Sequence, residues 1–275
     1  MNEKNNGILY IIATPIGNLE DITLRAIRIL NEVDLIAAED TRHTLKLLNH
    51  LGIKKPLISY HRHNEDIKTT ILIDKLLEGK NIALVTDAGT PAISDPGEEV
   101  VKQAIKNNIK IIPIPGACAL INALIVSGFD TKQFSFYGFL PVNKKNRKVK
   151  FDELKKEKST IILYEAPHKL LNTLNDILKY LGNINIVLAK EITKIHEDFM
   201  RGKVQDIINN IKDVRGEFMI VIEPKEIENE ETDEKLSLDE LYIKYKNQGL
   251  EKKEIIKRIA KDKGVTRNEI YKQFI

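Results

Sequence analysis

The chain has 275 residues, of which 42% are hydrophobic and 30% charged, a composition normal for a soluble globular protein. Its single cysteine, Cys118, excludes an internal disulfide and fits a reducing compartment. No apolar run reaches the roughly 20 residues that a membrane-spanning helix needs, and no signal peptide is found. We therefore expect a cytoplasmic protein with no membrane partner. The net charge of +3 does not by itself indicate a nucleic-acid partner.

Strands and helices alternate in the first part of the chain, which predicts a mostly parallel sheet covered by helices on both faces. Segments with helical periodicity, such as Lys68–Leu77 and Glu98–Lys106, separate the predicted strands. The strands are expected at Ile8–Ala13, Asp34–Ala38, Leu57–Tyr60, Ile82–Thr86 and Lys110–Ile114.

A second series of strands begins at residue 134 and predicts a second sheet. Its last two members lie close together in the sequence, which favours a partly antiparallel, mixed sheet. These strands are expected at Phe134–Gly138, Thr160–Tyr164, Asn185–Ala189, Glu197–Arg201 and Phe218–Ile222. The predicted fold class is α/β, with an N-terminal α/β domain at 1–116, a C-terminal α/β domain at 117–226, an acidic linker at 227–235 and a helical unit at 236–275.

The predicted helical unit has an excess of four basic residues over acidic ones. Its segment Glu251–Lys261 carries an apolar stripe, and a turn at Gly264 precedes Thr266, a natural N-cap for a second short helix. Two helices joined by such a turn have the form of a helix-turn-helix. The unit is interpreted either as an RNA-facing appendage or as a packing or dimerisation unit.

Three predicted strands of the first domain end in loops of small and turn-forming residues. The loops are Thr14–Asn18, Asp87–Gly97 and Pro115–Ala119. Ligands of open α/β sheets bind beyond the carboxyl ends of the strands, so the loops predict a shared crevice. Neither a G-x-G-x-x-G motif after the first strand nor a P-loop motif is present, which argues against an ordinary dinucleotide or P-loop site.

These loops and several later motifs together resemble the tetrapyrrole methylase superfamily of S-adenosylmethionine enzymes. Within it the chain is most similar to the subfamily that methylates a cytidine 2′-oxygen in small-subunit (16S) ribosomal RNA. The resemblance spans nearly the whole chain. The matching motifs are Thr14–Asp21, Glu39–Arg42, Asp87–Gly97, Pro115–Ala119, Tyr137–Pro141, Tyr164–His168 and Lys190–Lys194. Porphyrin-type enzymes usually have a Gly-Asp-Pro loop where this chain has Asp87-Ala-Gly-Thr-Pro91, which argues against a porphyrin substrate.

The resemblance implies that the cofactor S-adenosylmethionine is held between the two domains. It implies 16S ribosomal RNA or the small ribosomal subunit as the partner. It also implies that two copies of the chain form a homodimer. No metal is expected, because His61 and His63 lack further ligands at recognisable spacing. The residues expected to bind the cofactor are Pro15, Asp87, Ala88, Gly89, Ser94, Gly116, Cys118 and Ala119.

Methyl transfer from a sulfonium needs an aligned acceptor, and a general base would help to deprotonate a hydroxyl. The candidate bases are Glu191, Glu39 and Glu165, although Glu191 and Lys194 also fit a structural ion-pair cluster. Eight basic residues between Lys144 and Lys158 are expected either to neutralise RNA phosphates or to form a solvated helix. The residues expected to contact RNA are Arg42, His61, His168, Lys194, Lys144, Lys145 and Arg147.

Two other functions remain open from the sequence. One is a methyltransferase of the same superfamily that acts on a small cyclic molecule and does not need the basic tail. The other is a non-catalytic ligand sensor whose helix-turn-helix binds DNA, which predicts ligand binding without turnover.

Overall fold

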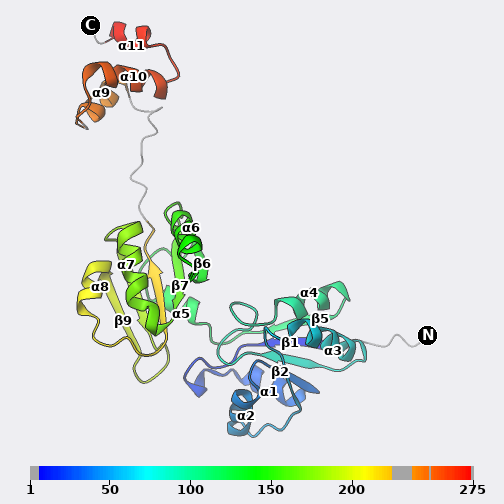
Figure 1. The fold of residues 1–275 in the computed structure, drawn as a ribbon. Helices are drawn as coiled ribbons and strands as arrows, with labels where there is room; N and C mark the ends of the chain where they lie inside the picture. Colours follow the sequence, from blue (N-terminus) through cyan, green and yellow to red (C-terminus); the bar gives the residue numbers. More distant parts are fainter. Residues whose placement is uncertain (1–5, 225–236, 248, 274–275) are drawn as a thin grey trace. The chain divides into compact units, whose positions relative to one another are not determined.

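The computed structural model describes residues 6–224, 237–247 and 249–273. The chain divides into two compact units, Met1–Pro224 and Lys225–Ile275. The first unit contains two five-stranded sheets (Figure 1). We call the first sheet with its helices the first lobe, and the segment from residue 119 to 222 the second lobe. No helix among the described residues is long and apolar enough to cross a membrane.

The first sheet has the strand order β3-β2-β4-β1-β5, and all of its neighbouring strands run parallel. The predicted parallel sheet is thus confirmed, with strand bounds within two residues of those expected. Buried apolar runs such as Ile82–Val85 are typical of strands covered on both faces. The strands are β1 Ile8–Ile12, β2 Leu35–Ala38, β3 Leu57–Ser59, β4 Ile82–Val85 and β5 Lys110–Ile114.

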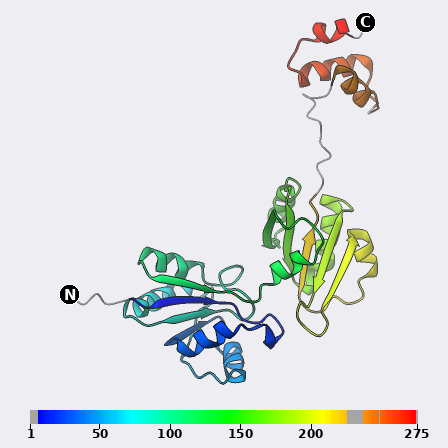
Figure 2. The same ribbon diagram turned by 180° about the vertical axis from the view of Figure 1, so that it is seen from behind.

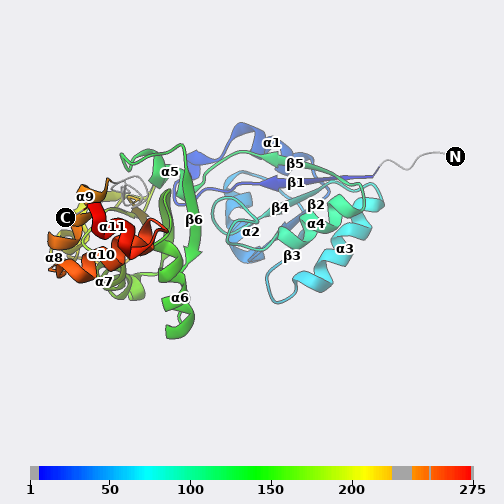
Figure 3. The same cartoon turned by 90° about the horizontal axis from the view of Figure 1, so that it is seen from above.

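Helices cover both faces of the first sheet. On one face Leu30 of α1 and Leu48 of α2 pack against the strands, and on the other face Leu72 of α3 and Val100 of α4 do so. Figure 3 shows α3 and α4 side by side over their face. The helices are α1 Leu24–Glu32, α2 Thr41–His50, α3 Glu65–Leu77 and α4 Glu98–Lys106, with a short 3-10 turn η1 at Leu19–Asp21.

The second sheet has the order β6-β7-β10-β8-β9 and is mixed, as predicted. Strands β6 and β7 pair in parallel, whereas β10 runs antiparallel to both β7 and β8, and β9 antiparallel to β8. The chain enters this lobe through α5, Ala119–Ile125, as seen from behind in Figure 2. The strands are β6 Phe134–Phe139, β7 Thr160–Glu165, β8 Asn185–Lys190, β9 Asp198–Lys203 and β10 Phe218–Ile222.

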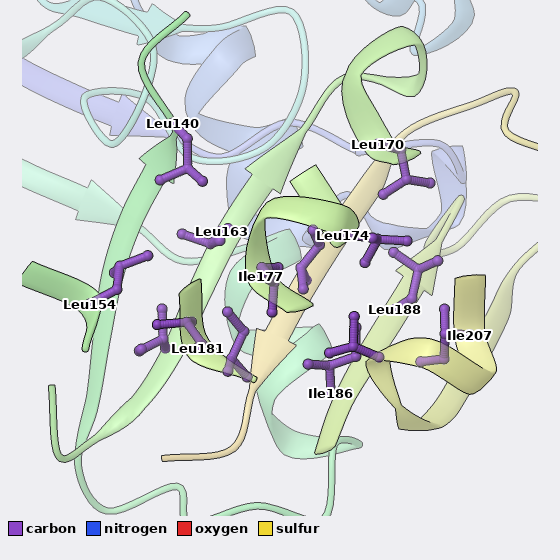
Figure 4. Close-up of a cluster of buried hydrophobic side chains, with 14 of the residues drawn as sticks. Leu140, Leu154, Leu163, Leu170, Leu174, Ile177, Leu181, Ile186, Leu188 and Ile207 are labelled. Atoms are coloured by element: carbon purple, nitrogen blue, oxygen red, sulfur yellow. The ribbon is translucent and has the colours of Figure 1, made fainter. Parts of the chain in front are cut away.

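The second lobe has its main core under three helices, α6 Lys144–Leu154, α7 Leu170–Leu181 and α8 Val204–Asn210. Leucine and isoleucine side chains of α7 point toward the strands of the sheet (Figure 4). Helix α5 covers the opposite face through Leu120, Ala123 and Leu124. A 3-10 turn, η2 Pro167–Lys169, leads from β7 into α7.

The C-terminal unit contains three described helices, α9 Leu238–Asn247, α10 Lys252–Asp262 and α11 Arg267–Gln273. They share a small core that includes Leu241, Ile259 and Ile270. The N–H and hydroxyl of Thr266 both donate to the Glu269 side chain, at 2.7 and 2.9 Å, so Glu269 reaches back to the predicted N-cap as in one half of a capping box. The predicted linker at 227–235 lies outside the described residues.

Candidate active site

A cavity of about 400 Å³ lies within the first unit and has walls from both lobes. The first lobe contributes the loops that follow β1, β4 and β5, which are the three loops expected to share a crevice. The second lobe contributes the ends of β7 and β8 and the beginning of β10. Apolar surface makes up most of the wall, as is usual for small-molecule sites.

Strand direction explains why these segments meet. The carboxyl ends of the parallel strands β1, β4 and β5 lie at one edge of their sheet. In the second sheet, β10 is antiparallel, so its first residue, Phe218, pairs with the last residues of β7 and β8, Glu165 and Lys190. The topology thus brings a strand beginning and two strand ends to the same place.

A backbone bridge fixes two of the loops to each other. The N–H of Thr14 donates to the carbonyl of Gly89 at 2.9 Å, and the N–H of Gly89 donates back to Thr14 at 3.0 Å. Gly89 has φ +82°, a conformation that favours glycine. A Cβ at this position would lie 3.1 Å from Ile16 and 3.6 Å from the carbonyl oxygen of Ala117. The wall at Gly89 is therefore closely packed against the Ile16 side chain and the Ala117 backbone.

The structure places five of the eight predicted cofactor residues in the cavity wall: Ala88, Gly89, Ser94, Cys118 and Ala119. The other three lie in the same loops but outside the lining: Pro15, Asp87 and Gly116.

The carboxylate of Asp87 accepts a hydrogen bond from the N–H of Asp40 at 3.1 Å. It therefore ties the loop after β4 to the start of α2. Burial raises the pKa of this carboxyl group, and the neighbouring carboxylate of Glu39 acts in the same direction.

Several lining residues were not among the predicted ones. In the first lobe they include Ile16, Thr90, Ile93 and Asp95, and in the second lobe Phe139, Tyr164, Ala189, Phe218 and Met219. Tyr164 lies within a recognised motif, which was a usable signal. Phe218 and Met219 had none, because only the antiparallel pairing of β10 brings them to this edge. Burial raises the pKa of Tyr164 to about 12, so its phenol stays protonated at neutral pH.

Of the three predicted bases, Glu165 lines the cavity, and it is 4% exposed. One carboxylate oxygen accepts from the N–H of Ala166 at 2.9 Å, and the other accepts from the hydroxyl of Thr173. The same hydroxyl receives a hydrogen bond from the Arg147 guanidinium at 2.7 Å, and Arg147 pairs with Asp176 at 2.6 Å. We call this Asp176–Arg147–Thr173–Glu165 series the buried polar chain.

Glu191 was expected either as the base or, with Lys194, in a structural ion-pair cluster. The two side chains do form an ion pair, with an N–O distance of 3.0 Å. Lys194 also pairs with Glu217 at 3.1 Å, and the Glu191 carboxylate accepts from the N–H of Glu217 at 2.8 Å. Burial acts to raise the pKa of Glu191, but the Glu217 N–H and the Lys194 ammonium outweigh it and lower the pKa. Neither Glu191 nor Lys194 is part of the cavity lining.

Glu39 follows β2 and accepts a hydrogen bond from the Thr86 hydroxyl at 2.7 Å. Thr86 is buried at the end of β4, beside the loop that lines the cavity. Glu39 itself is outside the lining.

The structure disperses the residues predicted to contact RNA over both lobes. Arg42, at the start of α2, has an 87% exposed side chain paired with Asp40. His61 follows β3, where its ring nitrogen contacts the Asn64 amide at 3.1 Å, and His168 is exposed in η2.

Lys144 and Lys145 are exposed in the first turn of α6. Arg147, one turn further along, is held in the buried polar chain, with its side chain 15% exposed. The exposure of Lys144 and Lys145 fits the solvated helix, one of the two expected alternatives, and RNA-phosphate contact stays a prediction. The structural contact of Arg147 was not among the expected roles.

The rings of His61 and His63 have centroids 6.0 Å apart. Within the part of the chain that the structure describes, no group of three or more His, Cys, Asp or Glu side chains has the arrangement of a metal site.

A comparison with known families matches residues 8–208 to the family of tetrapyrrole (corrin/porphyrin) methylases. The chain is a member of the tetrapyrrole methylase family. The matched segment includes both sheets up to α8, and hence most of the cavity wall.

Within this family, three relatives are each named ribosomal RNA small subunit methyltransferase I. The protein of Halalkalibacterium halodurans is 49% identical, over 97% of this chain and 94% of its own length. That of Bacillus subtilis is 46% identical, over 98% and 94%. That of Synechocystis sp. is 47% identical, over 96% of both.

Solved structures share the methylase fold at low sequence identity. A diphthine synthase superposes with a TM-score of 0.63 at 13% identity, over 79% of this chain and 90% of that one. The uroporphyrin-III-C-methyltransferase of Thermus thermophilus gives 0.55 at 20% identity, over 79% and 94%. The predicted fold class is confirmed.

S-adenosylmethionine is the cofactor of this methylase, and the cavity fits its chemistry. The volume of about 400 Å³ lies within the range of small-molecule pockets. Carboxylates of Asp95, Glu165 and Glu217 at the wall suit a ligand with an ammonium and a sulfonium. Apolar side chains of Ala189 and Met219 suit an adenine.

The carboxyl group of Asp95 gives the site a pH-dependent stability. Burial raises the pKa of Asp95, and the Glu39 and Asp87 carboxylates act in the same direction. A folded-state pKa above the unfolded one means that the folded protein binds the proton first as pH falls. Between this raised pKa and about 4, the wild type should therefore gain free energy of unfolding relative to Asp95→Asn. Urea denaturation of both proteins from pH 7 to 4 measures the difference, and a constant difference would contradict the expectation.

Proposed function

We propose that this methylase transfers the methyl group of S-adenosylmethionine to the ribose 2′-hydroxyl of a cytidine in 16S ribosomal RNA. The observation that carries the RNA substrate is the identity of 46–49%, over nearly full length, to relatives named ribosomal RNA small subunit methyltransferase I. The protein is thus an S-adenosylmethionine-dependent methyltransferase of ribosomal RNA. The 2′-oxygen and the cytidine rest on the motif resemblance alone.

A sulfonium supplies an electrophilic methyl group and leaves as a neutral thioether, so the reaction needs no acid for the leaving group. The protein's task is then to exclude water and to align the acceptor oxygen. The apolar wall of Ala189, Met219 and Tyr164 provides the dry surface. The protonated phenol of Tyr164 is available as a hydrogen-bond donor at the same wall.

Glu165 is proposed as the carboxylate nearest the reacting groups. It lines the cavity, and the Thr173 hydroxyl and the Ala166 N–H hold its two oxygens in place. In this proposal Glu191 and Glu39 do not act as the base. Glu191 is paired with Lys194, and Glu39 accepts a hydrogen bond from the Thr86 hydroxyl. Their roles are to position the loops around the cavity.

The RNA is proposed to contact exposed lysine and histidine side chains that follow the segments lining the cavity. Lys144 and Lys145 follow β6, and His168 follows the lining residue Pro167. Each phosphate contact should make RNA affinity fall with salt. The basic C-terminal unit is proposed to add further RNA contacts. With a ribosomal substrate, the enzyme is proposed to act in the cytoplasm, and a homodimer is proposed from the family resemblance.

The proposal is tested by mapping ribose methylation in 16S ribosomal RNA from cells with and without the gene. We expect one alkali-resistant linkage, at a cytidine, to disappear on deletion and to return when the gene is restored. A complementing gene that carries Gly89→Ala serves as the matched control, since its product should restore the methylation poorly. An unchanged methylation pattern would refute the RNA substrate and favour a small-molecule methylase. Ligand binding without any turnover would favour the sensor.

A further inference from the structure

Three aromatic rings form a connected group on the cavity face of the second sheet. The rings of Phe136 and Tyr164 meet edge to face, with centroids 4.9 Å apart, and Phe139 lies 5.5 Å from Tyr164 at a tilt of 50°. Tyr164 and Phe139 line the cavity, whereas Phe136 packs in the core behind them. The group therefore extends from the buried core to the cavity wall.

An irregularity in β6 places Phe139 on this face. In a regular strand, residues three apart point to opposite faces. The pairing of β6 with β7 shifts by one residue between Phe136 and Gly138, so Phe139 pairs with Tyr164 and shares the face of Phe136. Gly138 has φ +62°, which favours glycine at the bulge. Bulges commonly redirect a side chain next to an active site.

Phe139 is nonetheless 58% exposed, although it packs against Tyr164 and lines the cavity. Ile93, on the loop after β4, is another lining residue and is 50% exposed. The loop that carries Ile93 comes close to the end of β6, since a Cβ at Gly138 would lie 4.0 Å from the Ser94 hydroxyl oxygen. The cavity wall thus includes an exposed aromatic ring and an exposed aliphatic side chain from facing segments.

Exposed cations follow this ring closely in the sequence, at the start of α6. Lys144, Lys145 and Lys148 are exposed in α6 and, within the described residues, form no ion pair. An aromatic ring presented next to exposed lysines is the combination by which proteins bind single-stranded RNA, because bases stack on the ring while phosphates meet the cations.

We infer that Phe139 is the stacking platform for the base of the nucleotide that is methylated. This inference rests on the proposed function, because it requires an RNA substrate. Stacking on Phe139 holds the nucleotide out of its own base stack, with its ribose at the cavity mouth. The core contacts of Phe136 and Tyr164 keep the platform rigid. Phe139 is a residue that touches the substrate base, and it takes no part in proton transfer.

The test uses the full-length enzyme and small ribosomal subunits from cells that lack the gene. Loss of the ring in Phe139→Ala should lower kcat/KM for the subunits by about ten- to a hundredfold. Phe139→Leu keeps apolar volume without a ring face and should fall as far, whereas Phe139→Tyr should stay within about threefold of the wild type. The Kd for S-adenosylmethionine, measured by calorimetry, should change much less than kcat/KM in each of these variants.

Phe134→Ala is the matched control, because Phe134 lies in the same strand, is 39% exposed and is outside the cavity wall. It should keep wild-type kcat/KM. The platform is overturned by wild-type kcat/KM in Phe139→Ala, by equal rates in the leucine and tyrosine variants, or by a loss of cofactor affinity as large as the loss in kcat/KM. If the wild type itself methylates no subunit, the proposed function fails, and the platform fails with it.

Discussion

Replacing Gly89 by alanine should weaken the binding of S-adenosylmethionine about tenfold or more, because the loop that carries Gly89 would leave its present conformation. At φ +82° an L-residue costs roughly 1–2 kcal/mol. The new Cβ would also lie 3.1 Å from Ile16, so the loop has to shift by a few tenths of an ångström. That shift competes with the paired hydrogen bonds to Thr14. Calorimetric titration with S-adenosylmethionine measures the loss.

Gly128→Ala is the matched control for this prediction. Gly128 has almost the same φ, +81°, but a Cβ there meets nothing within 4 Å. The two variants should lose similar free energies of unfolding from the backbone conformation, while only Gly89→Ala loses cofactor affinity. Equal cofactor affinity in the wild type and Gly89→Ala would remove this loop from the binding site.

Removing the Arg147 side chain should lower the free energy of unfolding by about 2–4 kcal/mol, because it leaves half-buried polar groups without partners. Arg147 donates to Asp176 at 2.6 Å and to Thr173 at 2.7 Å, and Thr173 in turn donates to Glu165. Arg147→Ala therefore breaks the buried polar chain at its centre. The loss should also lower kcat, since the carboxylate of Glu165 in the cavity wall loses its support.

Lys148→Ala is the matched control, since Lys148 is the next residue of the same helix and is exposed. Its free energy of unfolding should stay within about 0.5 kcal/mol of the wild type, while its affinity for RNA falls with the lost charge. Arg147→Lys should recover only part of the stability, because an ammonium cannot reproduce the planar fork of donors. If Arg147→Ala unfolds at the wild-type urea midpoint and loses only RNA affinity, Arg147 is a phosphate contact, as the sequence suggested.

The contrast between Arg147 and its neighbours marks a limit of sequence reasoning. Lys144, Lys145 and Arg147 belong to one basic run, and nothing in the run itself distinguishes them. Packing of α6 against α7 decides that Arg147 turns inward, because Asp176 and Thr173 lie on the facing helix. These two partners of Arg147 are 29 and 26 residues away from it in the chain, so no local pattern reveals them.

The sequence alone determined the α/β class, the parallel first sheet, the mixed second sheet and the three loops that meet at the cavity. Local patterns suffice for these features, because buried strands and the small residues of close-packed loops are encoded in short segments. Only the tertiary structure decided that Phe218 and Met219 complete the cavity wall and that Phe139 faces it. The antiparallel pairing of β10 and the bulge in β6 bring those residues there, and both depend on partner strands distant in the sequence.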